Sequence, residues 1–370
     1  MNHSSTKFDS QAEPYGLPTR FAFDGELGDV MNDFFLRDMA KAKLSAKFKL
    51  YYRLRPYIPI PLRQLLQRER NQRIDVPSGW YLPTEFVQSF RDAIRKTKAH
   101  QAIHPWPDDY QISVSLTHDV ETEQGVKLVN NLAILEEKYG FRSAWNFIPY
   151  KYQVDPGLIR DLKDRGHEIG VHGYNHDGRL FESKRTFDRR TGPINKAIEQ
   201  YDSVGFRAPM VHRNLKWLQA LNVDYDASCF DIDPFQAMPG GVGSVWPFFA
   251  GKFVELPYTL PQDHTLLVSL GETTSKIWEE KLEYLRSLAG MAMLVTHPDY
   301  LDVPARLKVY ESFLQHLQSQ SQCWFALPKE ITQWWRQRDQ MRIECIEDRH
   351  VITGPNSSKA KLLDLRTITQ

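Results

Sequence analysis

The chain has 370 residues, of which 41% are hydrophobic and 25% charged, and its formal net charge is +1. This length suits one large domain or two smaller ones, and the near-neutral charge excludes a general attraction to nucleic acid. Three cysteines are too few for a disulfide framework, and no run approaches the roughly 20 apolar residues of a membrane span. Because the N-terminus is polar and has no apolar signal core, the sequence predicts a cytoplasmic protein.

The first part of the chain has helical patterns rather than alternating ones. Residues 1–20 are polar without periodicity and predict a flexible N-terminus. Residues 31–52 place apolar side chains on one helical face, and an amphipathic helix is expected around 86–97. Three prolines within 56–61 exclude a helix between them and predict an extended segment.

Positive charge is concentrated in the basic stretch 41–73, where ten Lys or Arg stand against one acid, Glu69. One interpretation is a solvated helix face. The other is peripheral contact with an anionic partner, either phospholipid headgroups or the diphosphate of a lipid-linked or nucleotide-linked sugar. Both interpretations stay open at this point.

From about residue 110 onward, strand and helix patterns alternate along the chain. With about seven strands, this alternation indicates a parallel α/β sheet, open or closed into a barrel. The expected strands are 111–117, 143–148, 167–171, 203–207, 224–228 and 291–296. The expected helices are 126–139, 157–165, 187–200, 214–221, 277–289 and 304–318.

The tail alternates weakly from residue 343 to 365 and predicts a small hairpin with Gly354-Pro355-Asn356 as its turn. The domain expectation is therefore a flexible N-terminus (1–20), a helical, basic extension (21–105), the barrel (106–338) and a C-terminal tail with the hairpin (339–370).

His172 and His176 stand four residues apart, after a short apolar run and among glycines. Imidazole is the commonest protein ligand for a borderline-soft divalent cation. Both rings reach one metal ion if the segment makes a helical turn, whereas spacing alone also fits two unrelated surface histidines. The rest of the chain decides between these interpretations.

Titratable side chains follow the predicted strands, at the edge that lines the active site in such sheets. A divalent cation held by His172, His176 and Glu121 leaves positions open for water and substrate, and makes amide hydrolysis feasible at neutral pH. Asp119 shares a strand face with Glu121 and is the expected base. Arg207 is expected to orient Asp119 through a paired hydrogen bond.

Three further residues complete the expected site. Asp226 is expected to fix Arg207 from behind. His297, after the last strand, is placed to protonate the leaving nitrogen. Trp246 is a candidate for a wall on which a sugar ring stacks, with an aromatic core as the alternative.

Four segments together resemble the polysaccharide deacetylase family (carbohydrate esterase family 4, the nodulation-factor deacetylase homology domain). They are Leu116–Glu121 (LTHDVE), His172–His176 (HGYNH), Arg207–Pro209 (RAP) and Leu294–His297 (LVTH). The resemblance covers about residues 110–330. It implies a deformed barrel of seven or eight strand–helix units, a divalent metal that is usually zinc, and removal of acyl groups from N-acetylated sugars.

Carried over by motif, the resemblance makes Asp119 the base and His297 the acid, with the oxyanion held by the backbone amide of Met210. The implied metal ligands are Glu121, His172 and His176, and the implied residues that set the base are Arg207 and Asp226. The chain departs from the family at Val120, where the second of two adjacent aspartates is usual, and Glu121 is chosen because relatives with an Asp-x-Glu pattern place the ligand one residue later.

The sequence therefore predicts a metal-dependent hydrolase that removes an N-acyl group from an amino sugar in a glycan, glycolipid or nucleotide-sugar precursor. Two alternatives stay open. One is a C–N hydrolase of a small cyclic amide or ureide on the same scaffold, and the other is a relative that binds a glycan or partner without turnover, which the Val120 departure favours.

Overall fold

A curled sheet of ten strands forms the centre of the molecule, in the order β1-β8-β9-β7-β6-β5-β4-β3-β10, with β11 also paired to β3. The computed structural model describes residues 16–54, 57–59, 62, 66, 69–70, 73–97, 100–236, 238–347 and 349–369. The strands of this sheet are β1 (Thr19–Arg20), β3 (Ile112–Val120), β4 (Ser143–Phe147), β5 (Glu168–His172), β6 (Gly205–Arg207), β7 (Tyr225–Asp226), β8 (Phe248–Ala250), β9 (Phe253–Glu255), β10 (Met291–Thr296) and β11 (Cys323–Phe325).

The sheet curls because an irregular segment after β9 reaches the opposite edge. Tyr258 forms a parallel bridge with Phe230, and the backbone N–H groups of Thr259 and Leu260 donate to the carbonyl of Met293 in β10, at 3.2 and 3.1 Å. The strands from β10 through β3 to β7 and β9 are parallel, as in a (β/α) barrel. The deformed barrel expected from the sequence is therefore confirmed.

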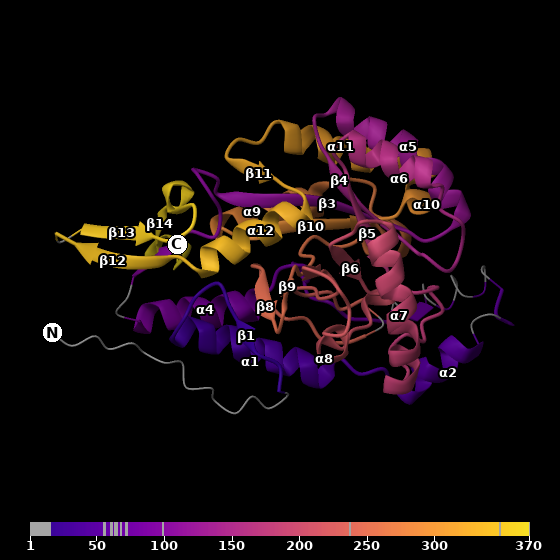
Figure 1. Ribbon diagram of the computed structural model, residues 1–370, viewed down its shortest axis with the longest axis horizontal. Helices are drawn as coiled ribbons and strands as arrows, with labels where there is room; N and C mark the ends of the chain where they lie inside the picture. The colour runs from indigo at the N-terminus through magenta and orange to yellow at the C-terminus, as the bar shows by residue number, and fades with distance from the viewer. Residues whose placement is uncertain are drawn as a thin grey trace.

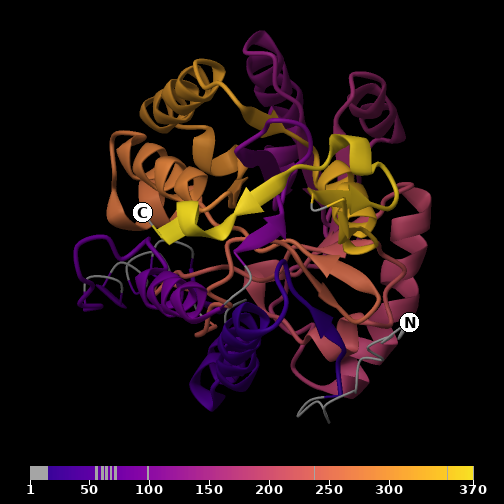
Figure 2. The ribbon, with the colours of Figure 1, turned by 90° about the vertical axis from the view of Figure 1, so that its left-hand side faces the viewer.

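Helices surround the sheet, as Figure 2 shows. The strands of the parallel sheet are almost wholly buried, which matches their continuous apolar sequences. The helices are α1 (Glu26–Lys41), α2 (Ala46–Leu54), α4 (Thr84–Lys96), α5 (Glu123–Lys138), α6 (Pro156–Asp164), α7 (Lys184–Gln200), α8 (Leu215–Leu218), α9 (Lys276–Ser287), α10 (Pro298–Leu301), α11 (Pro304–Gln318) and α12 (Pro328–Asp339). None of the described helices is long and apolar enough to cross a membrane.

The N-terminal helices share the core of the barrel. Phe23, Phe86 and Phe90 pack around Trp246, with ring centroids 4.9–6.1 Å apart. The expected single helical pattern over 31–52 is in fact two helices, α1 and α2, separated by residues 42–45. The prolines 56 and 61 lie outside the described residues.

The first strand of the described chain contacts the last α-helix. Thr19 and Arg20 form β1, which pairs antiparallel with β8, so this part of the expected flexible N-terminus is wrong, while residues 1–15 lie outside the description. Arg20 forms an ion pair with Asp339 at 3.0 Å, and Arg338 donates to the carbonyl of Ala22 at 2.8 Å. These contacts fasten the first strand to α12, a helix that the sequence did not predict.

The expected C-terminal hairpin is present, but its turn is elsewhere. β12 (Arg342–Ile346) pairs antiparallel with β13 (Arg349–Thr353), and the last register pair is Ile346 with Arg349. Gly354 and Asn356, both with positive φ, instead redirect the chain toward β14 (Leu362–Asp364). β14 pairs with β2 (Gln101–Ile103), so the tail is tied to the start of the barrel.

Candidate metal-dependent active site

The predicted site residues gather at the carboxyl ends of neighbouring strands. Asp119 is the penultimate residue of β3, and Glu121 directly follows that strand. His172 and Arg207 end β5 and β6 and are register partners, and His297 directly follows β10. Because parallel strands end at one rim, residues far apart in the sequence face one space.

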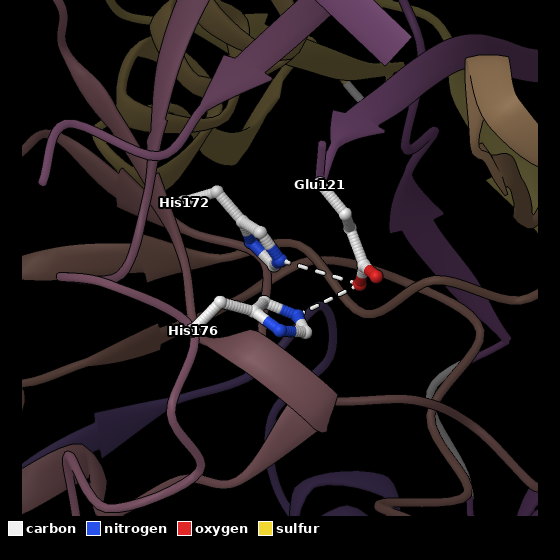
Figure 3. Close-up of side chains that lie close together, drawn as sticks. All are labelled: Glu121, His172 and His176. Atoms are coloured by element: carbon white, nitrogen blue, oxygen red, sulfur yellow. Dashed lines mark ion pairs between the residues drawn. The ribbon is translucent and has the colours of Figure 1, made fainter. Parts of the chain in front are cut away.

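Glu121, His172 and His176 offer ligand atoms that all lie within 4.8 Å of one another, as Figure 3 shows. A carboxylate oxygen of Glu121 is 2.7 Å from Nε2 of His176 and 4.0 Å from Nε2 of His172. Nδ1 of His172 lies 3.1 Å from the carbonyl of Arg207, which turns Nε2 toward the site. That Nε2 atom is buried and makes no hydrogen bond to a described residue, so the set suits a metal ion.

The segment between the two histidines is a loop and not the expected helical turn. His176 has a left-handed backbone conformation, with φ 59°, and Gly173 has φ 65°. A Cβ atom at Gly173 would lie 2.3 Å from the Pro209 ring, so a side chain there would displace the loop or Pro209. The glycine therefore permits the close approach of two segments that both line the site.

One carboxylate oxygen of Asp119 accepts two hydrogen bonds, and the other lies nearer His172. Oδ1 accepts hydrogen bonds from Nη1 of Arg207 at 3.0 Å and from Nδ2 of Asn146 at 2.9 Å, whereas Oδ2 is 3.8 Å from Nε2 of His172. Burial favours the protonated acid, but His172, Arg207, His297 and the Asn146 hydrogen bond outweigh it and lower the pKa of Asp119 to about 2. Asn146 was not predicted from the sequence.

Arg207 is fixed by other partners than the expected Asp226. Its Nε donates to the carbonyl of Ala227 at 3.0 Å, and Nη1 also donates to Thr117 at 2.9 Å. Asp226 accepts from the Ser228 hydroxyl at 2.8 Å, and no hydrogen bond joins it to Arg207 among the described residues. Asp226 therefore does not fix Arg207 by the expected hydrogen bond, because its carboxylate accepts from Ser228; burial raises the pKa of Asp226, and the charge of Arg207 opposes that rise.

His297 is held by Asp263, which sequence reasoning missed. Asp263 Oδ1 lies 2.7 Å from Nδ1 of His297, and Oδ2 accepts from the His297 backbone N–H at 2.7 Å. Burial alone would lower the pKa of His297, but Asp263, Glu121 and Asp119 raise it to about 10. Asp263 caps the π-helix His264–Leu270, 34 residues before His297, without a motif around it that could have indicated the pairing.

A cavity of about 600 Å³ opens over these residues. Glu121, His176, His297 and Met210 line it, with Met210 in a left-handed conformation (φ 58°) directly after Pro209. Trp246 is not among its lining residues. It is fully buried, and its indole N–H donates to the carbonyls of residues 288 and 289, so the expected sugar wall at Trp246 is wrong and the core alternative is correct.

The basic N-terminal segment forms the other wall of the cavity. Its cations and aromatic rings include Lys47, Phe48, Tyr51, Tyr52, Arg70 and Arg73. Tyr52 packs where a Cβ at Gly178 would be, and Arg53 bonds Glu182 at 2.5 Å. α2 is thus fastened to the loop that follows His176. Arg70 donates to the carbonyls of Phe235 and Gln236, at 3.1 and 3.0 Å.

Residues 108–224 match the family model described as polysaccharide deacetylase. The resemblance to this family that the sequence predicts is therefore confirmed over these residues. The match includes the segments of Asp119, His172 and Arg207, and ends before His297. A comparison with curated proteins gives no match.

Solved structures of similar fold include that of a protein from Mycobacterium smegmatis described as a polysaccharide deacetylase. It is 23% identical with a TM-score of 0.53, over 65% of this chain and 94% of that one. A second is PuuE allantoinase, at 15% identity and a TM-score of 0.51, over 66% of this chain and 95% of the other. At these identities the likeness establishes the fold of the polysaccharide deacetylase domain and leaves the substrate open.

Proposed function

We propose that this polysaccharide deacetylase domain hydrolyses the N-acyl amide of an amino sugar, with a divalent metal held by Glu121, His172 and His176. The observation that carries the proposal is that Glu121 and His176 of this ligand set line one cavity with His297, while His172 lies 3.8 Å from Asp119. A base, an acid and a metal site within one space are the parts that amide hydrolysis needs.

The donor set of two imidazoles and one carboxylate suits Zn²⁺. A bound ion would supply Lewis acidity, which lowers the pKa of water and polarises the acyl carbonyl. Glu121 takes the ligand role that Val120 cannot, because the aliphatic side chain of Val120 has no atom that can bind a metal ion.

Asp119 is the proposed base for the attacking water. Its Oδ2 atom takes the proton, while Arg207 and Asn146 hold Oδ1 and keep the carboxylate ionised at neutral pH. The backbone N–H of Met210 is the proposed donor to the oxyanion, since the left-handed turn after Pro209 places this residue in the cavity wall.

His297 is the proposed acid. It donates the Nε2 proton to the sugar nitrogen as the C–N bond breaks, releasing the free amine and the carboxylic acid. Asp263, paired with Nδ1, orients the ring and stabilises its cationic form. His297 is thus a protonated donor at neutral pH, and Asp263 is a positioning residue.

The charges of the cavity wall support a substrate in which the amino sugar carries an anionic group, such as the diphosphate of a nucleotide- or lipid-linked precursor. Lys47, Arg70 and Arg73 line the same cavity as His297. Glu69, also in this wall, lies 3.7 Å from Arg73 and offsets part of that charge. The aromatic residues Phe48 and Tyr51 give apolar surface on which a sugar ring can stack.

Metal content per chain, measured by elemental analysis on the wild type, Glu121→Ala and His176→Ala, tests the metal site. We expect about one ion per wild-type chain and a loss in both variants. The exposed hairpin residues Glu344 and His350 give matched controls, and Glu344→Ala and His350→Ala should keep the metal. A wild type that binds no zinc even when zinc is added would favour the non-catalytic binding alternative.

Activity on a substrate panel tests the reaction. We expect amine release from N-acetylated amino sugars, faster for a sugar diphosphate than for a neutral methyl glycoside. The panel also includes allantoin, since an allantoinase shares the fold. Turnover of allantoin without turnover of any N-acyl sugar would replace the sugar proposal by the cyclic-ureide alternative.

A further inference from the structure

Exposed large apolar side chains are concentrated in and just after α2. Leu50 and Leu54 are 58% and 48% exposed, and Tyr57 is 84% exposed. Leu62 and Leu66, further along the same segment, are also exposed. The remaining exposed large apolar residues of the described chain are spread over many elements, so this concentration calls for a partner.

α2 carries its apolar and basic residues on the surface in a defined arrangement. Leu50 and Leu54 are four residues apart and therefore share one helical face. Lys47, Lys49 and Arg53 flank them and are exposed. We call these five residues the α2 patch. Apolar side chains bordered by Lys and Arg are typical of a helix that lies in the plane of an anionic membrane surface.

The other side of α2 forms part of the active-site cavity. Phe48, Tyr51 and Tyr52 line the cavity together with His297 and Glu121. Lys47 belongs both to the α2 patch and to the cavity lining, so the patch directly borders the cavity. In Figure 1 α2 lies at the opposite end of the molecule from the hairpin β12–β13.

We propose that the α2 patch docks the protein on a bilayer containing anionic phospholipid, and that the substrate is an amino sugar attached to a membrane lipid. The two leucines enter the interfacial layer while Lys47 and Lys49 contact headgroup phosphates, and Arg53 adds positive charge beside its Glu182 partner. A cavity beside the docked helix then receives a sugar whose lipid stays in the bilayer. The substrate part rests on the proposed deacylase function, whereas the docking does not.

The apolar half of the α2 patch distinguishes a bilayer from a soluble polyanion. A nucleic acid or an acidic polysaccharide would contact the cations and leave Leu50 and Leu54 in water. A bilayer accepts both kinds of side chain, because the phosphates lie directly above the acyl boundary. The charge pattern also suits it, with ten basic residues against one acid over residues 41–73.

Vesicle co-sedimentation tests the docking without any assay of activity. The full chain is mixed with phosphatidylcholine vesicles, with or without phosphatidylglycerol, at low and high salt. We expect binding only with phosphatidylglycerol, weakening as salt screens the charges. Leu50→Ser/Leu54→Ser and Lys47→Glu/Lys49→Glu should each lower the partition coefficient by roughly tenfold or more.

Matched control variants come from the C-terminal tail, in the hairpin β12–β13 and the turn Ser357–Lys359 that follows it. Ile346→Ser/Val351→Ser removes two exposed apolar side chains, and Arg349→Glu/Lys359→Glu reverses two exposed charges. Both should bind vesicles as the wild type does. Equal loss in these controls, full binding by the leucine variant, or equal affinity for soluble dextran sulfate would overturn the proposal.

The leucine variant also separates the two proposals by activity. Its turnover of a soluble N-acetylated sugar should equal that of the wild type, while turnover of a lipid-linked sugar in vesicles should fall. If the leucine variant loses vesicle binding and neither it nor the wild type hydrolyses any N-acetylated sugar, the docking proposal stands and the deacylase function is refuted. Equal turnover of the lipid-linked sugar by both proteins would refute the lipid-linked substrate.

Discussion

The Asp263 carboxylate holds His297 twice, at the ring Nδ1 and at the backbone N–H, each at 2.7 Å. This double contact fixes both the position of the residue and the rotation of its ring. It leaves Nε2 as the atom that faces the cavity, 3.7 Å from the Glu121 carboxylate. The proposed acid is therefore oriented by a residue that itself touches no substrate.

We expect Asp263→Asn to lower kcat by about 10²-fold while KM changes little, because the ring loses its orienting charge and proton donation is a transition-state contribution. Steady-state kinetics on an N-acetylated sugar measures this. The variant should retain its metal, which separates the effect from a damaged ligand set, and Asp302→Asn on the exposed surface serves as the control. An unchanged kcat would refute the positioning role.

Gly173→Ala should destabilise the fold and weaken metal binding, because the new Cβ would meet Pro209 at 2.3 Å beside both histidine ligands. Gly140→Ala is the matched control: Gly140 also has a positive φ (86°), but a Cβ there meets nothing within 4 Å. The control carries only the backbone cost of about 1 kcal/mol. Thermal unfolding and zinc titration measure the difference, and equal behaviour of the two variants would show that the Pro209 contact is unimportant.

Stability should fall as the pH rises from about 4.5 to 7, because of Glu168. Burial raises its pKa to about 7, against the hydrogen bonds from Tyr225 and the Lys329 backbone that favour its ionised form. A folded-state pKa above the unfolded value of 4.5 means that this stabilisation is complete at low pH and is lost between about pH 4.5 and 7. The loss amounts to about 3 kcal/mol.

Glu168→Gln should remove that part of the pH dependence, since the amide does not ionise at this buried position. Urea unfolding at pH 5 and pH 8 measures it. The exposed Glu344→Gln should leave the wild-type slope unchanged. A Glu168→Gln variant that keeps the full wild-type slope would assign the pH dependence to other groups.

Lys47→Ala/Arg73→Ala should raise KM for a sugar diphosphate severalfold and leave a neutral N-acetylated sugar unaffected, because both cations line the cavity wall. Lys184→Ala/Arg185→Ala, on the exposed start of α7, is the charge-matched control. An equal change for charged and neutral substrates would indicate that the wall is perturbed and the charges are not used.

The regular parts of the barrel follow from sequence periodicity, since local patterns determine them. The strand 291–296 and the helix 304–318 have the bounds expected for them. The rim residues Asp119, Glu121, His172, Arg207 and His297 also follow, because the strand-end rule needs only the strand bounds.

The misses depend on contacts between distant segments. Asp263 contacts His297 from the start of a π-helix that the sequence did not predict. The Asp226 side chain is turned to Ser228, a choice of rotamer that residue spacing does not encode. Trp246 lies in the core because rings of the N-terminal segment, Phe23 and Phe90, pack against it. In each case the orientation of the side chain depends on contacts in the folded chain, which a local sequence pattern cannot describe.

The contacts between the β1 segment and α12 affect the order of folding. Arg20 meets Asp339, and Ala22 meets Arg338, across more than 300 residues of chain. During synthesis, the contacts between the β1 segment and α12 form only after α12 has left the ribosome. Such a high contact order favours slow, post-translational closure, in which the aromatic rings of the N-terminal helices stay accessible to chaperones until the last helix arrives.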